Sequence, residues 1–201
     1  MGNIGLIGRA RVGKDTAGQW LVDNRGYRRV SFADPLKEAA LRINPIVRAV
    51  GEGDGFGAYT IDLLEVIEDL GWEAAKDQFP EVRRILQELG MAVRDLDPEF
   101  WLRQALAKVT EANEAGVPVV ITDVRFPNEA ESLRRAGFHL AYIDRPGMPQ
   151  LDHESEKALT VDDADYTILN CGPVEDLHGK VEVFAQRVYA IESRRHGNRV
   201  W

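Results

Sequence analysis

The stretch Gly8-Arg9-Ala10-Arg11-Val12-Gly13-Lys14-Asp15-Thr16 follows a short apolar run, Ile4–Ile7, and precedes a segment of helical character. Its two glycines and its lysine match the spacing of a phosphate-binding loop. Such a loop wraps phosphates with successive backbone N–H groups, so its tightest points exclude a Cβ atom. The following helix adds its positive N-terminal end, and the lysine adds a mobile charge. The stretch therefore predicts a strand, a phosphate loop and a helix.

The loop departs from the usual motif at one position. The residue after the lysine is normally Ser or Thr, whose hydroxyl binds magnesium, whereas here it is Asp15, followed by Thr16. Asp15 could ligate Mg²⁺ directly or through water, and Thr16 could ligate the metal or contact a phosphate oxygen. The alternative is a glycine-containing turn that binds nothing, but its place between an apolar strand and a helix favours the phosphate loop.

Composition limits the classes of function that this chain can have. Its 201 residues suffice for one α/β domain with a lid, and the 44% hydrophobic content is that of an ordinary globular protein. The net charge of −8 argues against nucleic-acid or membrane partners, but it leaves room for a small phosphorylated substrate. The single cysteine, Cys171, excludes an intrachain disulfide. Without a long apolar span, we expect a cytoplasmic protein.

Apolar runs alternate with helical patterns along most of the chain. This alternation predicts a three-layer α/β fold with a central parallel sheet, helices on both faces and a mobile lid. The expected strands are residues 4–7, 27–32, 119–123, 138–143 and 165–170. The expected helices are residues 14–24, 61–70, 82–93, 97–115, 128–136 and 174–193, with another after Asp34. We expect one domain, residues 1–201, with a helical substrate-binding insertion at about 35–115 and a lid at about 145–160.

The run Val119–Asp123 is typical of a strand buried on both faces, and it ends in an acid. Ligands of open α/β sheets bind at this end of the strands, so Asp123 is a candidate for the shell of a magnesium ion. The alternative is an aspartate that caps the next loop. Arg125 would project from the same rim toward a phosphate, and Asn128 is the expected helix cap.

Other polar residues have both structural and functional interpretations. Asp34 precedes Pro35 and is a good N-cap, but a catalytic role is compatible with capping. Arg84 and Gln87 belong either to a solvated helix face or to a binding site. Residues 144–157 are polar and interrupted by proline, as in a mobile lid, where Arg145 could stabilise charge on a transferring phosphoryl group.

Several blocks together resemble the deoxynucleoside monophosphate kinases of bacteriophages. The blocks are Gly8–Thr16, Ser31–Lys37, Leu86–Gly90 with Arg94, Phe100-Trp101, Asp123–Glu129, His153–Glu156 and Asn170–Gly172. The resemblance implies transfer of the γ-phosphoryl group of ATP to a deoxynucleoside monophosphate, with Mg²⁺ as cofactor. The product would be the diphosphate used for DNA synthesis. The Asp15 departure is shared with this kinase group.

The resemblance also implies roles for individual residues. The catalytic candidates are Lys14, Arg125, Arg145 and Asp34. The ATP-binding candidates are Arg11, Val12, Gly13, Lys14, Asp15 and Thr16, with Asn170 and Gly172 beside the adenine. The monophosphate candidates are Asp34, Lys37, Arg84, Gln87, Arg125 and Glu156. The metal candidates are Asp15, Thr16 and Asp123.

Other interpretations remain open at this point. A sister kinase, of the dephospho-coenzyme A or phosphomevalonate type, uses a similar loop and lid. A nucleotide-binding regulator or motor subunit would bind ATP without a small acceptor. A structural domain with a decayed loop would bind no nucleotide. The apolar helices at 61–70 and 82–93 could face a core or a second subunit, so a homodimer is possible.

Overall fold

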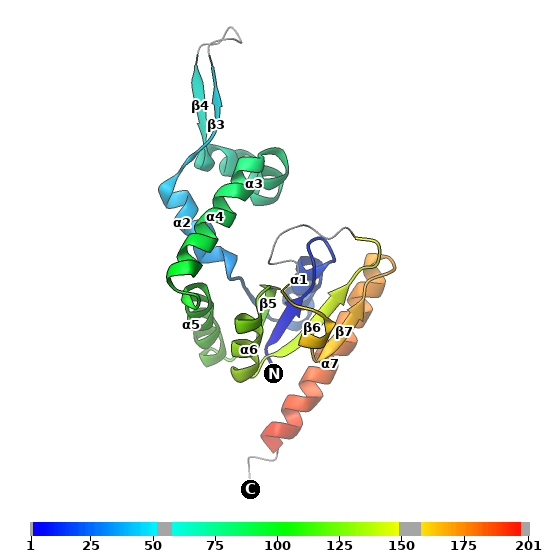
Figure 1. The fold of residues 1–201 in the computed structure, drawn as a ribbon. Coiled ribbons are helices and arrows are strands. Elements are labelled where there is room, and N and C mark those ends of the chain that lie inside the picture. The colour runs from blue at the N-terminus through cyan, green and yellow to red at the C-terminus, as the bar shows by residue number, and fades with distance from the viewer. Residues whose placement is uncertain (1, 52–57, 149–157, 198–201) are drawn as a thin grey trace. The chain divides into compact units, whose positions relative to one another are not determined.

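The computed structural model describes residues 2–51, 58–148 and 158–197, and the chain divides into two compact units (Figure 1). The first unit combines Met1–Phe32 with Gln104–Trp201, and the second is Ala33–Arg103. Each unit has a hydrophobic core of its own. The phosphate loop lies in the first unit.

A parallel sheet forms the centre of the first unit. Within the described residues it has the strand order β2-β5-β1-β6-β7, and all of its neighbouring strands are parallel. The strands are β1 (Ile4–Ile7), β2 (Arg28–Val30), β5 (Val119–Val124), β6 (His139–Asp144) and β7 (Tyr166–Leu169). In the register of β1, Ile4 lies opposite Val120 on one side and His139 on the other. The predicted central parallel sheet is confirmed.

Helices cover both faces of this sheet. They are α1 (Lys14–Arg25), α6 (Pro127–Arg135) and α7 (Val174–Gly197), with α5 (Phe100–Glu114) entering from the second unit and a 3₁₀ turn at Val161–Asp163. Ile4 and Leu6 share a buried cluster with residues of α1 and α7, whereas a Cβ on Gly5 would approach Leu133 of α6. Because successive strand residues point to opposite faces, α6 lies across the sheet from α1 and α7. The three-layer prediction is confirmed.

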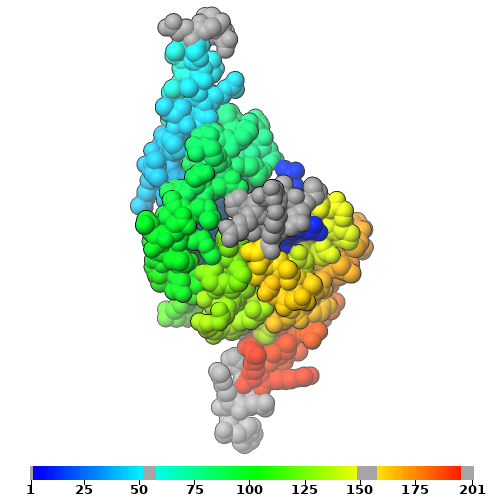
Figure 2. Space-filling view, in the orientation of Figure 1, coloured from blue at the N-terminus to red at the C-terminus, as the bar shows by residue number. Residues whose placement is uncertain are grey.

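The second unit is built from helices and a β-hairpin. Its elements are α2 (Ala33–Ile43), β3 (Ile46–Val50), β4 (Tyr59–Asp62), α3 (Leu63–Gln78), α4 (Pro80–Leu96) and the first turn of α5. The hairpin extends beyond the packed helices of its own unit (Figures 1 and 2). It pairs Val50 with Tyr59, and residues 52–57 between these strands lie outside the described residues.

The helix expected at residues 61–70 begins two residues later than predicted, and its first helical segment ends where predicted, because Gly71 is non-helical (φ +69°) and kinks α3 before it continues to Gln78. Ile61 belongs to β4, and α3 starts at Leu63 because the Asp62 carboxylate accepts a hydrogen bond from the Glu65 N–H (3.0 Å). An aspartate in this N-cap role ends the extended segment and starts the helix. The hairpin itself was not predicted, because each of its strands depends on the other for its hydrogen bonds.

The apolar helices of the second unit face a core within that unit. Buried side chains from α2, β3, α3 and α4 form one cluster: Ala40, Val47, Leu63, Val66, Ala75 and Val82. Partly buried Ile85, Leu86 and Leu89 continue it along α4. These helices therefore contribute to a core, and the homodimer stays a prediction.

Two predicted helix caps are wrong. α2 begins at Ala33, so Asp34 lies inside its first turn; the N–H of Phe32 is already bonded to the Asp123 carboxylate (3.1 Å). α6 begins at Pro127 with Phe126 as its N-cap, so Asn128 is not the cap. There Glu129 accepts hydrogen bonds from the preceding backbone N–H groups, and proline suits the first helical position.

The helix α7 is joined to the sheet by a polar contact at Glu192. Its carboxylate lies 3.0 Å from His139 Nε2 and accepts a hydrogen bond from Arg195 (2.7 Å). Burial favours the neutral carboxyl, but the bond with His139 and the charge of Arg195 outweigh it and lower the pKa of Glu192 below its ordinary 4.5. None of the helices in the described ranges has the length and apolar character needed to cross a bilayer.

This contact predicts a pH-dependent contribution to stability. The lowered pKa means that the stabilisation is present above about pH 4.5 and is lost as the pH falls through the folded-state pKa. We expect Glu192→Gln to reduce the free energy of unfolding at pH 7 by about 1 kcal/mol, and the difference from wild type to shrink at pH 3. Thermal denaturation at both pH values measures it. Glu131→Gln, which removes an exposed ion pair with Arg135, is the control and should have a smaller effect. If the stability difference between wild type and Glu192→Gln grew as the pH fell, the stabilising role of the charged Glu192 would be contradicted.

Candidate active site

The phosphate loop contains glycine where the backbone and its neighbours require it. Gly8 has φ +141°, and a Cβ there would lie 2.4 Å from the carbonyl oxygen of Ile143. Gly13 has φ +106°, and a Cβ there would lie 2.8 Å from Asn170 Nδ2. Both values are unfavourable for residues with a side chain. The loop therefore packs against the ends of β6 and β7 with its backbone.

Lys14 holds the loop from inside. Its Nζ donates hydrogen bonds to the carbonyl oxygens of Gly8 (2.5 Å) and Arg9 (2.7 Å). Its side chain is buried although it carries an ammonium group. A buried ammonium is costly unless oxygen atoms surround it, and here main-chain oxygens of the loop serve. The positive charge thus lies within the loop, next to the N-terminus of α1.

A pocket of about 420 Å³ opens beside the loop. Its volume is within the range of small-molecule sites. It is lined by Arg11, Gly13, Lys14, Asp15, Thr16, Arg145, Asn170, Gly172, Pro173, Val174 and Leu177. The structure thus brings together seven of the eight predicted ATP-binding residues with Arg145; the eighth, Val12, has a buried side chain.

The sequence analysis missed the apolar wall of this pocket. Pro173, Val174 and Leu177 line it at the start of α7. Val174 and Leu177 are three residues apart, so they lie on one face of the helix, directly after the glycine of the Asn170–Gly172 block. This spacing in the sequence could have indicated an apolar wall beside the Asn170–Gly172 block.

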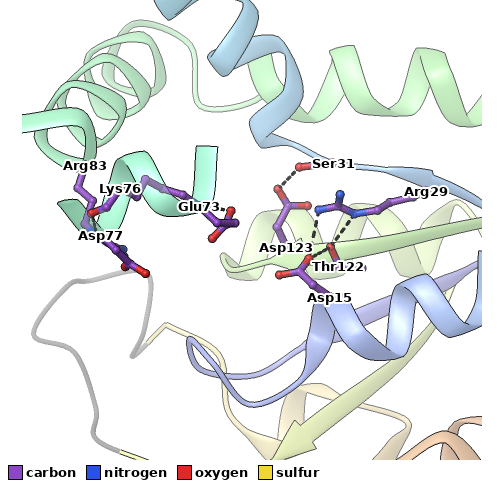
Figure 3. A network of polar contacts seen from close by, with 9 residues as sticks. All are labelled: Asp15, Arg29, Ser31, Glu73, Lys76, Asp77, Arg83, Thr122 and Asp123. Atoms are coloured by element: carbon purple, nitrogen blue, oxygen red, sulfur yellow. Dashed lines mark hydrogen bonds and ion pairs between the residues drawn. The ribbon is translucent and has the colours of Figure 1, made fainter. Parts of the chain in front are cut away.

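Asp15 takes part in a small polar network at the ends of β2 and β5 (Figure 3). Its Oδ1 accepts hydrogen bonds from Thr122 Oγ1 (2.9 Å) and from Arg29 (3.1 Å). Arg29 also donates to Thr122 Oγ1 (3.4 Å). The carboxylate that replaces the usual hydroxyl therefore has an arginine as counter-charge. Arg29 and Thr122 were not among the predicted site residues, because strands distant in sequence bring them here.

Asp123 connects β5 to the chain that follows β2. Its carboxylate accepts a hydrogen bond from Ser31 Oγ (2.7 Å) and from the backbone N–H of Phe32 (3.1 Å) (Figure 3). Phe32 is the last residue of the first unit before α2. Asp123 therefore fixes the point at which the chain leaves the sheet.

The donor set fits magnesium bound together with a nucleotide. Across the described ranges, no group of three or more His, Cys, Asp or Glu side chains could hold a metal by itself. Mg²⁺ usually keeps several waters and takes one or two carboxylates plus substrate phosphates. Asp15, Asp123 and the Thr16 hydroxyl, near the end of the sheet that carries the loop, are ligands of that kind.

The remaining predicted residues lie elsewhere. Arg125 is in the first unit, two residues before α6, and it is not among the residues that line the described pocket. Asp34 and Lys37 are on α2 of the second unit, where the Lys37 ammonium lies 5.5 Å from the ring centroid of Trp72. Glu156 and most of the expected lid at 145–160 lie outside the described residues.

On α4 of the second unit, Arg84 makes a two-point ion pair with Glu81 (2.6 and 2.8 Å), and Gln87 is exposed. The hydrogen bond from Arg84 lowers the pKa of Glu81, so the carboxylate is charged at neutral pH. Arg84 and Gln87 are three residues apart on the helix and therefore share a face.

The strand order, the loop after β1 and the helices on both faces define a P-loop kinase fold. A solved dephospho-CoA kinase from Campylobacter jejuni has this fold, with a TM-score of 0.50 and 11% identity over 94% of this chain and 98% of that one. At this identity the likeness extends to the fold alone.

The sequence comparisons give the family. The model of the deoxynucleotide monophosphate kinase family matches residues 49–181, about two thirds of the chain, which therefore belongs to that family. A protein of Acanthamoeba polyphaga mimivirus that carries this name is 29% identical over 190 residues, 89% of this chain and 93% of its own length. The deoxynucleotide monophosphate kinase of Enterobacteria phage T4 is 31% identical over 111 residues, 53% of this chain and 46% of its own length.

Proposed function

We propose that this protein transfers the γ-phosphoryl group of ATP to a deoxynucleoside monophosphate and so forms the diphosphate for DNA synthesis. The observation that carries the proposal is one pocket that brings together the phosphate loop, Lys14, Arg145 and the Asn170–Gly172 block. Membership of the deoxynucleotide monophosphate kinase family supports the choice of acceptor.

The chemistry suits a site without a general base. The attacking group would be a phosphate oxygen of the acceptor, which is already anionic, so catalysis needs alignment and charge neutralisation. The backbone N–H groups of the loop and Lys14 would hold the ATP phosphates. Arg145 and Arg11, which line the same pocket, would place positive charge beside the transferred group.

Magnesium would enter with the nucleotide. Asp15 or Thr16 would hold it from the first turn of α1, and Asp123 would complete its shell from β5. When bound, the ion neutralises charge on the phosphate oxygens. The Arg29 partner keeps the Asp15 carboxylate paired before the metal arrives.

The acceptor would be held by the residues that the resemblance to the phage kinases implies. The candidates are Asp34, Lys37, Arg84, Gln87, Arg125 and Glu156. Basic and amide groups are suited to a monophosphate and to the edge of a base. The exposed Arg84–Glu81 pair would be exchanged for a phosphate at little cost, because exposed ion pairs contribute little stability.

A coupled assay of ADP formation with ATP, Mg²⁺ and each deoxynucleoside monophosphate in turn tests the proposal. We expect at least one monophosphate to raise ADP formation about a hundredfold or more over ATP alone, because an aligned acceptor replaces water. Removal of Mg²⁺ with EDTA should abolish the acceleration, and calcium should restore it poorly.

The control acceptors are dephospho-coenzyme A and phosphomevalonate. Activity on either of these alone would assign a sister kinase instead. Tight ATP binding with no acceleration by any acceptor would indicate a regulator. If ATP with Mg²⁺ failed to raise the melting temperature, the loop would bind no nucleotide.

A further inference from the structure

The side chain of Asn170 is fixed between the sheet and the phosphate loop. Its backbone N–H donates to the carbonyl of Asp144 at the end of β6 (2.7 Å). The residue is only 7% exposed, and its Nδ2 donates to the carbonyl oxygen of Val12 (2.9 Å). A carbonyl oxygen only accepts hydrogen bonds, so the nitrogen of the amide, and not its oxygen, must face Val12.

The same amide fills the space beside the next residue of the loop. A Cβ on Gly13 would lie 2.8 Å from Asn170 Nδ2 and 3.0 Å from Leu177 Cδ2. Asn170 thus contacts the Val12–Gly13 peptide both by hydrogen bonding and by packing. In a trans peptide the C=O and the following N–H point in opposite directions. With the Val12 carbonyl held by Asn170, the Gly13 N–H is directed away from it.

The orientation of this peptide decides what the loop offers to an anion. Gly13 permits a range of backbone angles that other residues avoid, so the peptide could rotate if nothing held it. A rotated peptide would replace an N–H donor with a carbonyl oxygen, which repels phosphate oxygens. The hydrogen bond from the Asn170 side chain to the Val12 carbonyl opposes such a rotation.

We propose that Asn170 is a positioning residue that locks the Val12–Gly13 peptide in the orientation that binds phosphates. This inference rests on the proposed function, because it takes the loop to bind a nucleotide through its phosphates. It gives Asn170 a role that is independent of the base, in contrast to a contact with adenine. Its effect reaches the nucleotide through the loop backbone.

Asn170→Asp tests this directly, because the carboxylate has the same shape but no donor for the Val12 carbonyl. Calorimetric titration measures binding of ATP and of inorganic tripolyphosphate, which has no base. We expect the affinity for both ligands to fall at least tenfold and by the same factor. Loss of a donor and repulsion between two oxygens both favour rotation of the peptide.

Two further variants separate the loss of the hydrogen bond to Val12 from the effect of an added negative charge. Asn170→Ala removes the amide without adding a charge, and it should weaken both ligands at least threefold. Asn24→Asp is the matched control: its Nδ2 also donates to a main-chain carbonyl at 2.9 Å, that of Trp20, but on an exposed face of α1. Its affinities should stay within twofold of wild type. Thermal melts identify any variant that does not fold, and Asn170→Ala carries the test if Asn170→Asp is unfolded.

Unchanged tripolyphosphate affinity in Asn170→Ala would overturn the proposal, because the loop would then be oriented without the amide. Loss of ATP binding with tripolyphosphate binding retained would also overturn it, in favour of a contact with the base. If the wild-type protein bound neither ligand, the proposed function itself would fail, so the two failures are distinguishable.

Discussion

Lys14→Met is expected to lower turnover about a thousandfold while the protein remains folded. Lys14 is buried within the loop, and its ammonium reaches the carbonyls of Gly8 and Arg9. Bound phosphates would offer this ammonium anionic oxygens, a stronger attraction than two neutral carbonyls. In the transition state, negative charge shifts onto the leaving phosphate oxygen as the P–O bond breaks, so the loss should appear in kcat and not only in KM. Steady-state kinetics with saturating ATP measures it.

Lys180→Met is the matched control for this variant. Lys180 lies on α7 of the same unit, and its Nζ also donates to a main-chain carbonyl, that of Leu169 (2.6 Å). Lys180 is not among the residues that line the described pocket. Its replacement should leave turnover within twofold of wild type. Normal turnover in Lys14→Met would contradict the assignment of the loop.

Gly8→Ala is expected to destabilise the first unit and to abolish ATP binding. The added Cβ would lie 2.4 Å from the carbonyl oxygen of Ile143, a backbone atom of β6 that cannot move independently of the sheet. The φ of +141° adds strain. Together these effects should lower the free energy of unfolding by about 3 kcal/mol. Denaturant unfolding measures the stability, and calorimetric titration measures the binding.

Gly26→Ala separates the strain of a positive φ from the clash. Gly26 ends α1 with φ +68°, and a Cβ there would meet nothing within 4 Å. It should cost about 1–2 kcal/mol, the penalty of the left-handed conformation alone, with ATP binding retained. If Gly8→Ala bound ATP as wild type does, the loop would not depend on its contact with β6.

The local chemistry of the sequence was enough to predict the loop and the sheet. The glycine positions follow from backbone sterics, since Gly8 and Gly13 adopt positive φ values that other residues avoid. The run Val119–Asp123 predicted a central strand because a strand buried on both faces is apolar along its length. These properties depend on a residue and its near neighbours, so they can be read without the fold.

Two helix-cap predictions failed, one beside a contact from a distant strand and one where another local signal was stronger. Asp34 and Asn128 are both good caps by composition, but neither caps its helix. At the start of α2, Asp123 on a distant strand binds the N–H of Phe32, and Asp34 lies inside the first turn. The start of α6 is set by Pro127 with the Glu129 side chain.

The sequence by itself determined that a phosphate loop stands between a buried strand and a helix, because spacing and backbone freedom are local. Only the tertiary structure decided which groups surround that loop. Asn170 meets the carbonyl of Val12 from 158 positions away, and Thr122 meets Asp15 from 107. The hairpin of β3 and β4 likewise exists only through its pairing. Such contacts follow from strand order and register, which arise when the whole chain packs.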